Sequence, residues 1–166
     1  MVKKLKSRAG FTLTELLITL LILTMFSAAC LLGMTTAFSV RNNIIKASDA
    51  DILASTVTQA ISGEIRMSSD ATVENEVLTY RSANYGANCT MMLDADGRIK
   101  VGPDNAPRDL LSSAAYGYSS GSRSESKLHI EDLHFESDGA AIKVTFHICD
   151  EGGHALVSAE FSVAPL

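Results

Sequence analysis

The chain has 166 residues, which is the size of one domain. Hydrophobic residues make up 46% of the sequence and concentrate in residues 16–40, a run of 25 residues without a charge. This composition excludes a disordered or fibrous chain, a fully soluble protein and a multi-pass membrane protein, because one segment alone is long and apolar enough to cross a bilayer.

Charge is distributed unevenly along the chain. The first ten residues hold four basic side chains and no acid, whereas the remainder holds 10 basic and 19 acidic residues; the four are Lys3, Lys4, Lys6 and Arg8. An acidic remainder offers no basic surface for nucleic acid. Basic residues beside a membrane span stay in the cytoplasm. We therefore expect a single-pass protein of the cytoplasmic membrane, with its N-terminus inside and its acidic part outside.

Four interpretations fit residues 1–40. The first is a cleaved secretory signal peptide, for which Ser27-Ala28-Ala29 is a small-residue cleavage site. The second is a lipoprotein signal with Cys30 as the acylated residue, although Ser27 stands where a bulky aliphatic residue is expected. The third is an uncleaved signal anchor. The fourth is a leader that is cut before the apolar run.

Glu15 separates these interpretations. A carboxylate inside an apolar helix costs about 2.5–3.5 kcal/mol at mid-bilayer on insertion scales, so it indicates a function and needs a cationic partner. No Lys or Arg lies between Arg8 and Arg41. A cut between Gly10 and Phe11 would create a partner, the new α-amino group four residues before Glu15. Glu15 therefore favours the fourth interpretation.

The residues around this junction resemble the N-terminal signal of type IV prepilins and type II secretion pseudopilins. They read Ala9-Gly10-Phe11-Thr12-Leu13-Thr14-Glu15-Leu16-Leu17-Ile18. The family pattern is a short basic leader, a glycine, phenylalanine, Thr or Ser, Leu or Ile, one variable residue, glutamate and an apolar helix. Every position of this chain matches the pattern.

The resemblance implies a role for three residues. Gly10 would be the last leader residue, where prepilin peptidase requires a small side chain. Phe11 would become the new N-terminus and would be methylated by the same enzyme. Glu15 would pair with the amine of a neighbouring subunit during assembly.

The apolar run departs from many major pilins in its lack of proline. The first proline of the chain is Pro103, and Gly33 is the one residue that interrupts the run. This favours a minor pilin or pseudopilin. One type of tip pseudopilin lacks the glutamate, so Glu15 places the subunit below the tip or within the shaft.

Helical spacing of apolar residues continues beyond the apolar run. These residues are Ile44, Ile45, Ile52, Leu53, Val57, Ala60, Ile61 and Ile65. No proline interrupts them, so the pattern predicts one helix over residues 11–67. The alternative is two helices with a break at residues 41–43.

After Ser68 the apolar pattern changes to a period of two, which indicates strands. The predicted strands span residues 76–81, 88–93, 98–101, 128–135, 142–148 and 155–163. We expect a bulge near Asp132, a tight turn at Asp94-x-Asp96-Gly97 and a hairpin turn at Glu151-Gly152-Gly153. Each strand has one apolar face, which predicts an antiparallel sheet with one face on a core.

Residues 102–126 read as a long surface loop that is rich in Gly, Pro and Ser, with a short helical turn near residues 110–115. Within it, Tyr116 and Tyr118 either make contacts with a partner or cover an edge of the core. The role of the loop stays open.

Two cysteines, Cys89 and Cys149, fall in the exported part, where a disulfide can persist. We expect them to be bonded to each other on the outer face or at the end of the sheet. The alternative is two thiols in a reducing habitat. Cys30 lies in the apolar run and is expected to act as a small apolar side chain there.

The sequence contains no phosphate-binding loop, nucleophile elbow or His-Glu-x-x-His motif. A soft metal at His147, Cys149 and His154 is a weak alternative to solvated histidines beside a disulfide. We therefore expect no catalytic residues, no cofactor and no metal.

The sequence thus predicts an α+β fold, a long N-terminal helix packed on an antiparallel β-sheet, as in pilins. Residues 1–10 are expected to be a basic leader, 11–40 the transmembrane and polymerising half of the helix, and 41–166 an exported globular domain. The predicted function is a non-enzymatic filament subunit of a type IV pilus, a type II secretion system or a DNA-uptake machine. Its expected partners are prepilin peptidase, other pilin or pseudopilin subunits and the assembly platform. The alternative is a signal-anchored or lipoprotein binding domain that does not polymerise.

Overall fold

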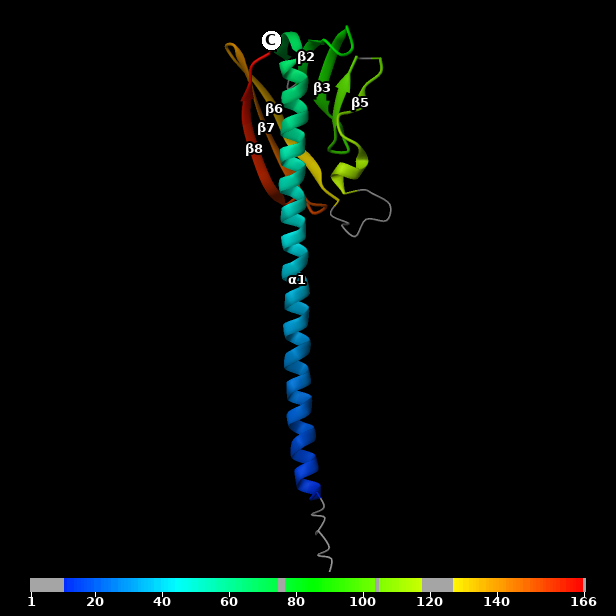
Figure 1. Ribbon diagram of the computed structural model, residues 1–166, viewed down its shortest axis with the longest axis vertical. Helices are drawn as coiled ribbons and strands as arrows, with labels where there is room; N and C mark the ends of the chain where they lie inside the picture. Colours follow the sequence, from blue (N-terminus) through cyan, green and yellow to red (C-terminus); the bar gives the residue numbers. More distant parts are fainter. Residues whose placement is uncertain (1–10, 75–76, 104, 118–126, 166) are drawn as a thin grey trace, which may run out of the picture. The chain divides into compact units, whose positions relative to one another are not determined.

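The computed structural model describes the chain except for residues 1–10, 75–76, 104, 118–126 and 166. It divides into two compact units, residues 1–43 and 44–166. The helix α1 spans Leu13–Arg66 without interruption, which confirms the prediction of one helix and not two (Figure 1). In the described residues after α1, the chain forms two antiparallel sheets and one short 3₁₀ helix.

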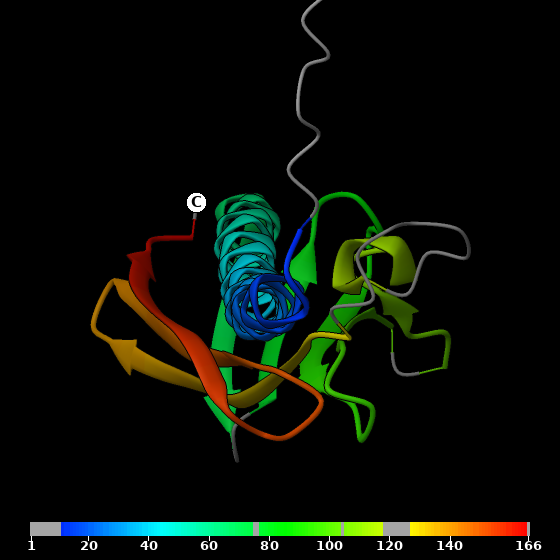
Figure 2. The ribbon, with the colours of Figure 1, turned by 90° about the horizontal axis from the view of Figure 1, so that it is seen from below.

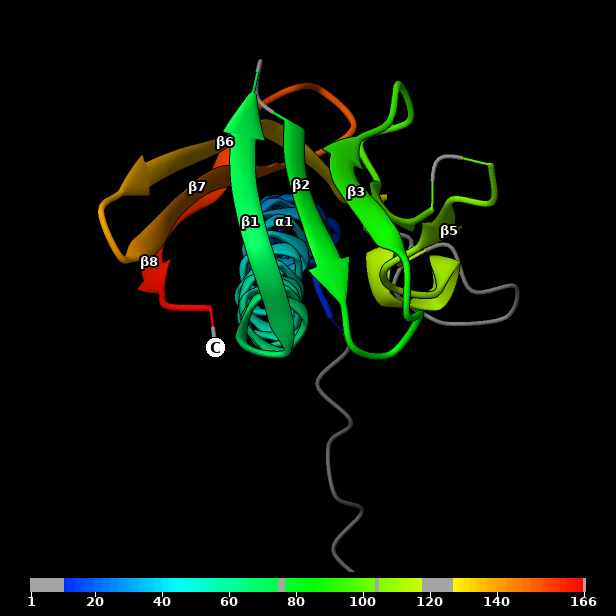
Figure 3. The ribbon, with the colours of Figure 1, turned by 90° about the horizontal axis from the view of Figure 1, so that it is seen from above.

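The first sheet has five strands in the order β1-β2-β3-β4-β5. Their bounds are Ser68–Glu74 (β1), Val77–Ser82 (β2), Asn88–Leu93 (β3), Ile99–Gly102 (β4) and Arg108–Asp109 (β5). β1, β2 and β3 run side by side in Figure 3. The 3₁₀ helix η1 follows at Ser113–Tyr116, close to the short helical turn that the sequence predicts.

The second sheet has three strands in the order β6-β7-β8, with bounds His129–Asp138, Ala141–Cys149 and Ala155–Val163. It is the predicted hairpin with one further strand beside it (Figure 2). The predicted bulge is confirmed, because the pairing of β6 with β7 shifts between Glu131 and His134. At the bulge, Asp132 adopts a positive φ of 52°.

The expectation of a single sheet is wrong. β5 is only two residues long, and the described strands fall into two separate sheets, the second of which begins at His129. A backbone hydrogen bond connects the β3–β4 turn of the first sheet to β6 of the second, from the Ile130 N–H to the Gly97 carbonyl at 2.9 Å. The sequence also does not predict β1, because most of its side chains are polar and only partly covered.

The hydrophobic core of the second unit draws on the helix and on both sheets. The helix buries Ala50, Leu53, Ala54, Val57, Ile61 and Ile65. The first sheet adds Leu78, Tyr80, Cys89, Met91, Ile99 and Val101, and the second adds Ile130, Leu133, Phe135, Ile142, Val144, Phe146, Ile148 and Val163. Tyr116 of η1 is fully buried, so it covers the core as one of the two readings predicts; Tyr118 lies outside the described residues.

Candidate functional site

The candidate site is the start of α1, where the sequence predicts cleavage and docking. Thr12 directly precedes the helix, and its carbonyl accepts the first helical hydrogen bond, from the Leu16 N–H at 3.2 Å. Its hydroxyl accepts a second one, from the Glu15 N–H at 3.3 Å. Thr12 is therefore the N-cap of the helix. Gly10 lies outside the described residues, whereas Phe11 precedes the cap and is 76% exposed.

Glu15 is the third residue of α1 and lies in its first turn. A carboxylate is favourable there because the N-terminal end of a helix carries a partial positive charge. Within the described part of the chain, the structure places no hydrogen-bond or ion-pair partner against this carboxylate. The geometry therefore leaves the Glu15 carboxylate open to a group from outside the described residues.

The helix beyond Glu15 is apolar on every side. Its large side chains from Leu16 to Val40 are half exposed or more, which is the surface of a helix that meets lipid or other helices. This segment is long and apolar enough to cross a membrane. The segment therefore supports membrane anchoring.

Hydroxyl groups within the apolar run bond to the helix itself. Those of Thr19, Thr24, Ser27, Thr35 and Thr36 each donate to a backbone carbonyl three or four residues earlier, at 2.8–3.0 Å. An unsatisfied polar group in hydrocarbon costs several kcal/mol. These bonds remove that cost, so the polar residues of the run are compatible with a bilayer.

Comparison with protein families supports this account of the N-terminus. The family model "Prokaryotic N-terminal methylation motif" matches residues 5–31. The chain carries the N-terminal methylation motif. The motif supports a place in the type IV pilin and pseudopilin family, as the sequence predicts. No curated protein and no solved structure matched the chain.

The match includes Gly10, Phe11 and Glu15, and the long helix on antiparallel sheets agrees with a pilin-like α+β architecture. The motif implies processing by prepilin peptidase and assembly with other pilin subunits. Sequence reasoning overlooked the cap at Thr12. The signal was present, because Thr12 and Glu15 have the Thr-x-x-Glu spacing of a capping box.

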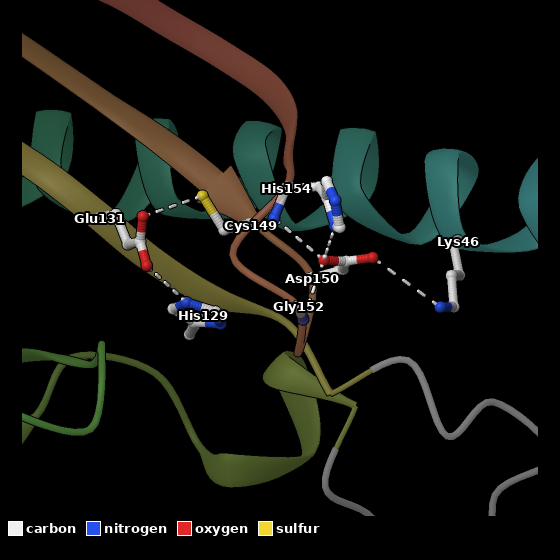
Figure 4. Close-up of polar contacts among 7 residues, drawn as sticks. All are labelled: Lys46, His129, Glu131, Cys149, Asp150, Gly152 and His154. Atoms are coloured by element: carbon white, nitrogen blue, oxygen red, sulfur yellow. Dashed lines mark hydrogen bonds and ion pairs between the residues drawn. The ribbon is translucent and has the colours of Figure 1, made fainter.

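The expected disulfide between Cys89 and Cys149 is absent, and both residues are thiols in the structure. Cys89 lies in β3, where it is fully buried in the core. Cys149 ends β7, and its side chain points toward Glu131 (Figure 4). The two residues therefore belong to different sheets, and the structure does not contain the bond that the sequence predicts between them.

Three side chains link the ends of β6 and β7. The Cys149 thiol donates to Glu131 Oε2 at 3.4 Å, and His129 Nε2 lies 2.9 Å from Glu131 Oε1 (Figure 4). The hydrogen bond with His129 is the main cause that holds the pKa of Glu131 below its usual value. Burial, followed by the hydrogen bond to Glu131, raises the pKa of Cys149 to about 11.

The neighbouring turn holds a second polar group. Asp150 Oδ1 accepts the N–H groups of Gly152 and His154 at 3.0 Å each, and Oδ2 lies 3.9 Å from Lys46 Nζ of α1 (Figure 4). His147 instead contacts the Ser158 hydroxyl at 2.7 Å. The weak alternative of a metal site needs three side chains to converge, and each of them contacts a different residue. His147 contacts Ser158, Cys149 contacts Glu131 and His154 contacts Asp150. Across the described residues, no three His, Cys, Asp or Glu side chains are placed to hold a metal.

We expect Cys149 to react slowly with iodoacetamide in the folded chain at about pH 8, because the thiolate is the nucleophile and a raised pKa keeps it scarce. Raising the pH toward the pKa of about 11 should increase the rate, because more of the thiol then ionises. Replacing Glu131 by glutamine removes the nearby carboxylate and should increase the rate several-fold at about pH 8. Mass spectrometry of the alkylated peptides measures both rates.

The control is the same pair of proteins in denaturant, where Cys149 should react at equal rates in the parent chain and in the Glu131→Gln variant. When the folded chain is kept under oxidising conditions and is then denatured with iodoacetamide present, both Cys89 and Cys149 should be alkylated. Recovery of a bonded peptide pair would contradict the structure.

Proposed function

We propose that this protein is a structural subunit, a minor pilin or pseudopilin, of a type IV pilus or of a type II secretion or competence-type filament. The observation that carries the proposal is the methylation motif at residues 5–31, with a Gly10-Phe11 junction ahead of an apolar helix that contains Glu15. Residues 1–10 are the leader, 11–40 the membrane and polymerising half of the helix, and 41–166 the exported domain. The role is non-catalytic and needs no cofactor.

Processing supplies the partner for Glu15. Prepilin peptidase cuts between Gly10 and Phe11 and methylates the new amine of Phe11. In the assembled filament this amine pairs with the Glu15 carboxylate of a neighbouring subunit. The pairing is favourable because a charge in an apolar environment is tolerated only when it is paired. Before assembly the subunit stays in the cytoplasmic membrane, with its basic N-terminus in the cytoplasm.

The exposed face of α1 in the second unit also supports assembly. Ile45, Ser48, Ile52, Ser55 and Gln59 recur at intervals of three and four residues, are exposed and carry no charge. They lie opposite the residues that the helix buries in the core. A solvated helix face normally carries charged side chains. An uncharged face with an isoleucine that is 61% exposed, Ile52, suits contact with a helix of another subunit.

The mature N-terminus tests this proposal. We expect mass spectrometry of the protein from its native host to show a chain that begins at Phe11 with one methyl group on its α-amine. Replacing Gly10 by a bulky residue should leave the full-length chain in the membrane, because the peptidase requires a small side chain there. The matched control is Ala9, where the same replacement should leave cleavage unchanged.

Filaments sheared from the cells should contain the mature chain and lack the Gly10 variant. A chain that begins at Cys30 with an attached lipid would contradict the proposal. A chain cut after Ala29 that carries no lipid on Cys30 would contradict it as well. The first outcome would establish the lipoprotein alternative and the second a secretory signal peptide.

A further inference from the structure

β8 is an open edge of the second sheet. Among the described strands it pairs with β7 alone, so its other side presents backbone N–H and C=O groups with no strand beside them (Figure 1). The strand is nine residues long, Ala155–Val163. An open edge of this length is a template for pairing with another chain, and proteins normally protect such edges.

The other three sheet edges of the described chain carry such protection. β1 is bulged near Asp70, which adopts a positive φ of 54°. β5 is only two residues long and directly follows a proline. β6 is bulged as well, and its Ile130 N–H donates to the Gly97 carbonyl of the β3–β4 turn. Bulges, short strands and cover by a loop are the usual means of blocking an edge.

β8 lacks these features along most of its length. The one shift in its pairing lies at its start, opposite Ile148 and Cys149. The strand contains no proline and no lysine, and its single charge is Glu160. Lys143 of β7 lies 2.7 Å from that carboxylate, so the charge is compensated within the same sheet. From Val157 onward the strand therefore has no bulge, no proline and no uncompensated charge to oppose a second strand.

The core-facing side of β8 is incompletely covered. Val157, Ala159 and Phe161 lie at alternate positions, pack against the core and are only partly buried. Phe161 meets Phe146 of β7 edge to face, with 6.4 Å between the ring centroids. Side chains of an added strand would lie beside these residues and remove apolar surface from water. The strand that fits this edge has apolar side chains at every second position.

A second copy of this chain does not supply such a strand. Antiparallel pairing of two β8 edges needs a two-fold rotation, which would point the two α1 segments in opposite directions. In the proposed function both chains enter one membrane through the residue-44 end of that segment, so anchored copies cannot pair in this way. Parallel pairing would set core-facing side chains of one copy beside solvent-facing ones of the other. The three remaining edges of the described chain are protected.

We propose that the open edge of β8 receives an extended strand, with apolar side chains at alternate positions, from a different subunit of the same filament. The added strand continues the sheet β6-β7-β8 by one strand. The inference rests on the proposed function, because it names a contact of the exported domain within the filament. This contact is separate from docking through α1.

Hydrogen exchange of the parent chain, followed by mass spectrometry, tests the inference. The full-length chain in detergent micelles is compared with the same chain in filaments sheared from its native host. Alternate residues of an antiparallel edge strand direct their N–H groups away from the neighbouring strand. In β8 these groups should exchange at least about tenfold more slowly in the filament. β7 has a strand on both sides and is the internal control, so its exchange should change little.

Two variants add an independent measurement. Ala159→Glu places a charge on the core-facing side of the edge strand, which is a means by which proteins block edge pairing. Its ratio of subunit in filaments to subunit in membranes should fall several-fold. Ser162→Glu is the matched control, because it adds the same charge on the exposed side, opposite Lys143. It should be incorporated as the parent chain is, and circular dichroism in micelles checks that both variants are folded.

Equal exchange of β8 in micelles and in filaments would overturn the inference and leave the proposed function intact, and this comparison decides even if Ala159→Glu does not fold. Normal incorporation of a folded Ala159→Glu would overturn the inference as well. Protection of β8 in a concentrated micellar sample of this chain alone would also overturn it, because a second copy would then occupy the edge. Absence of the parent chain from the filaments would instead overturn the proposed function.

Discussion

Replacing Glu15 by alanine should leave membrane insertion and cleavage intact and remove the subunit from filaments. Insertion cannot suffer, because a carboxylate in an apolar helix costs about 2.5–3.5 kcal/mol at mid-bilayer and alanine removes that cost. The helix start should also persist, because Thr12 caps the Glu15 N–H through the backbone of residue 15 and not through its side chain. What disappears is the proposed partner for the neighbour's amine.

The measurement is the ratio of subunit in sheared filaments to subunit in membranes, and we expect it to fall at least about tenfold, the factor that 1.4 kcal/mol represents. Glu15→Gln is the matched control for shape. It should be excluded as strongly as Glu15→Ala, because it keeps the size of the side chain but not its charge. Incorporation of the glutamine variant at the parent level would show that charge pairing is not the docking interaction.

Replacing Gly97 by alanine should destabilise the second unit, residues 44–166, more than the same change at Gly139. Gly97 adopts a positive φ of 69°, which costs an alanine about 1–2 kcal/mol. A Cβ at this position would also lie 2.6 Å from the His129 Cβ and 3.0 Å from the Ile130 carbonyl oxygen. Relieving such a clash costs typically about 1–3 kcal/mol more.

The clash falls on a backbone hydrogen bond between the β3–β4 turn and β6, from the Ile130 N–H to the Gly97 carbonyl. The turn itself depends on the same glycine, whose N–H donates to the Asp94 carbonyl at 2.9 Å. The variant should therefore loosen the contact between the sheets as well as the turn. We expect a loss of about 2–5 kcal/mol in the free energy of unfolding.

Gly139→Ala is the matched control. Gly139 has nearly the same φ, 62°, but a Cβ there would meet nothing within 4 Å. It should therefore cost only the backbone term of about 1–2 kcal/mol. Urea unfolding of the two variants in detergent micelles, followed by circular dichroism, measures the difference. Equal losses for Gly97→Ala and Gly139→Ala would show that the contact between the sheets is not tight at Gly97.

The long helix and its N-terminal motif could be predicted from the sequence because both depend on local order along the chain. An uncharged run and a continuous helical spacing without proline define α1 over Leu13–Arg66. The residues at 5–31 define the methylation motif through their order alone. Alternation of apolar and polar residues likewise predicted β3 and the β7–β8 hairpin, because it reports which side of a strand is buried.

Only the tertiary structure decided which strands share a sheet and which side chains meet. Alternation assigns a face to a strand but not a hydrogen-bonding neighbour, and that neighbour is set by packing between residues far apart in the sequence. This packing placed β5 and β6 in different sheets, buried Cys89 in the core and turned Cys149 toward Glu131. A disulfide requires two side chains to approach in one specific geometry, and in the structure Cys89 and Cys149 are free thiols that lie in different sheets.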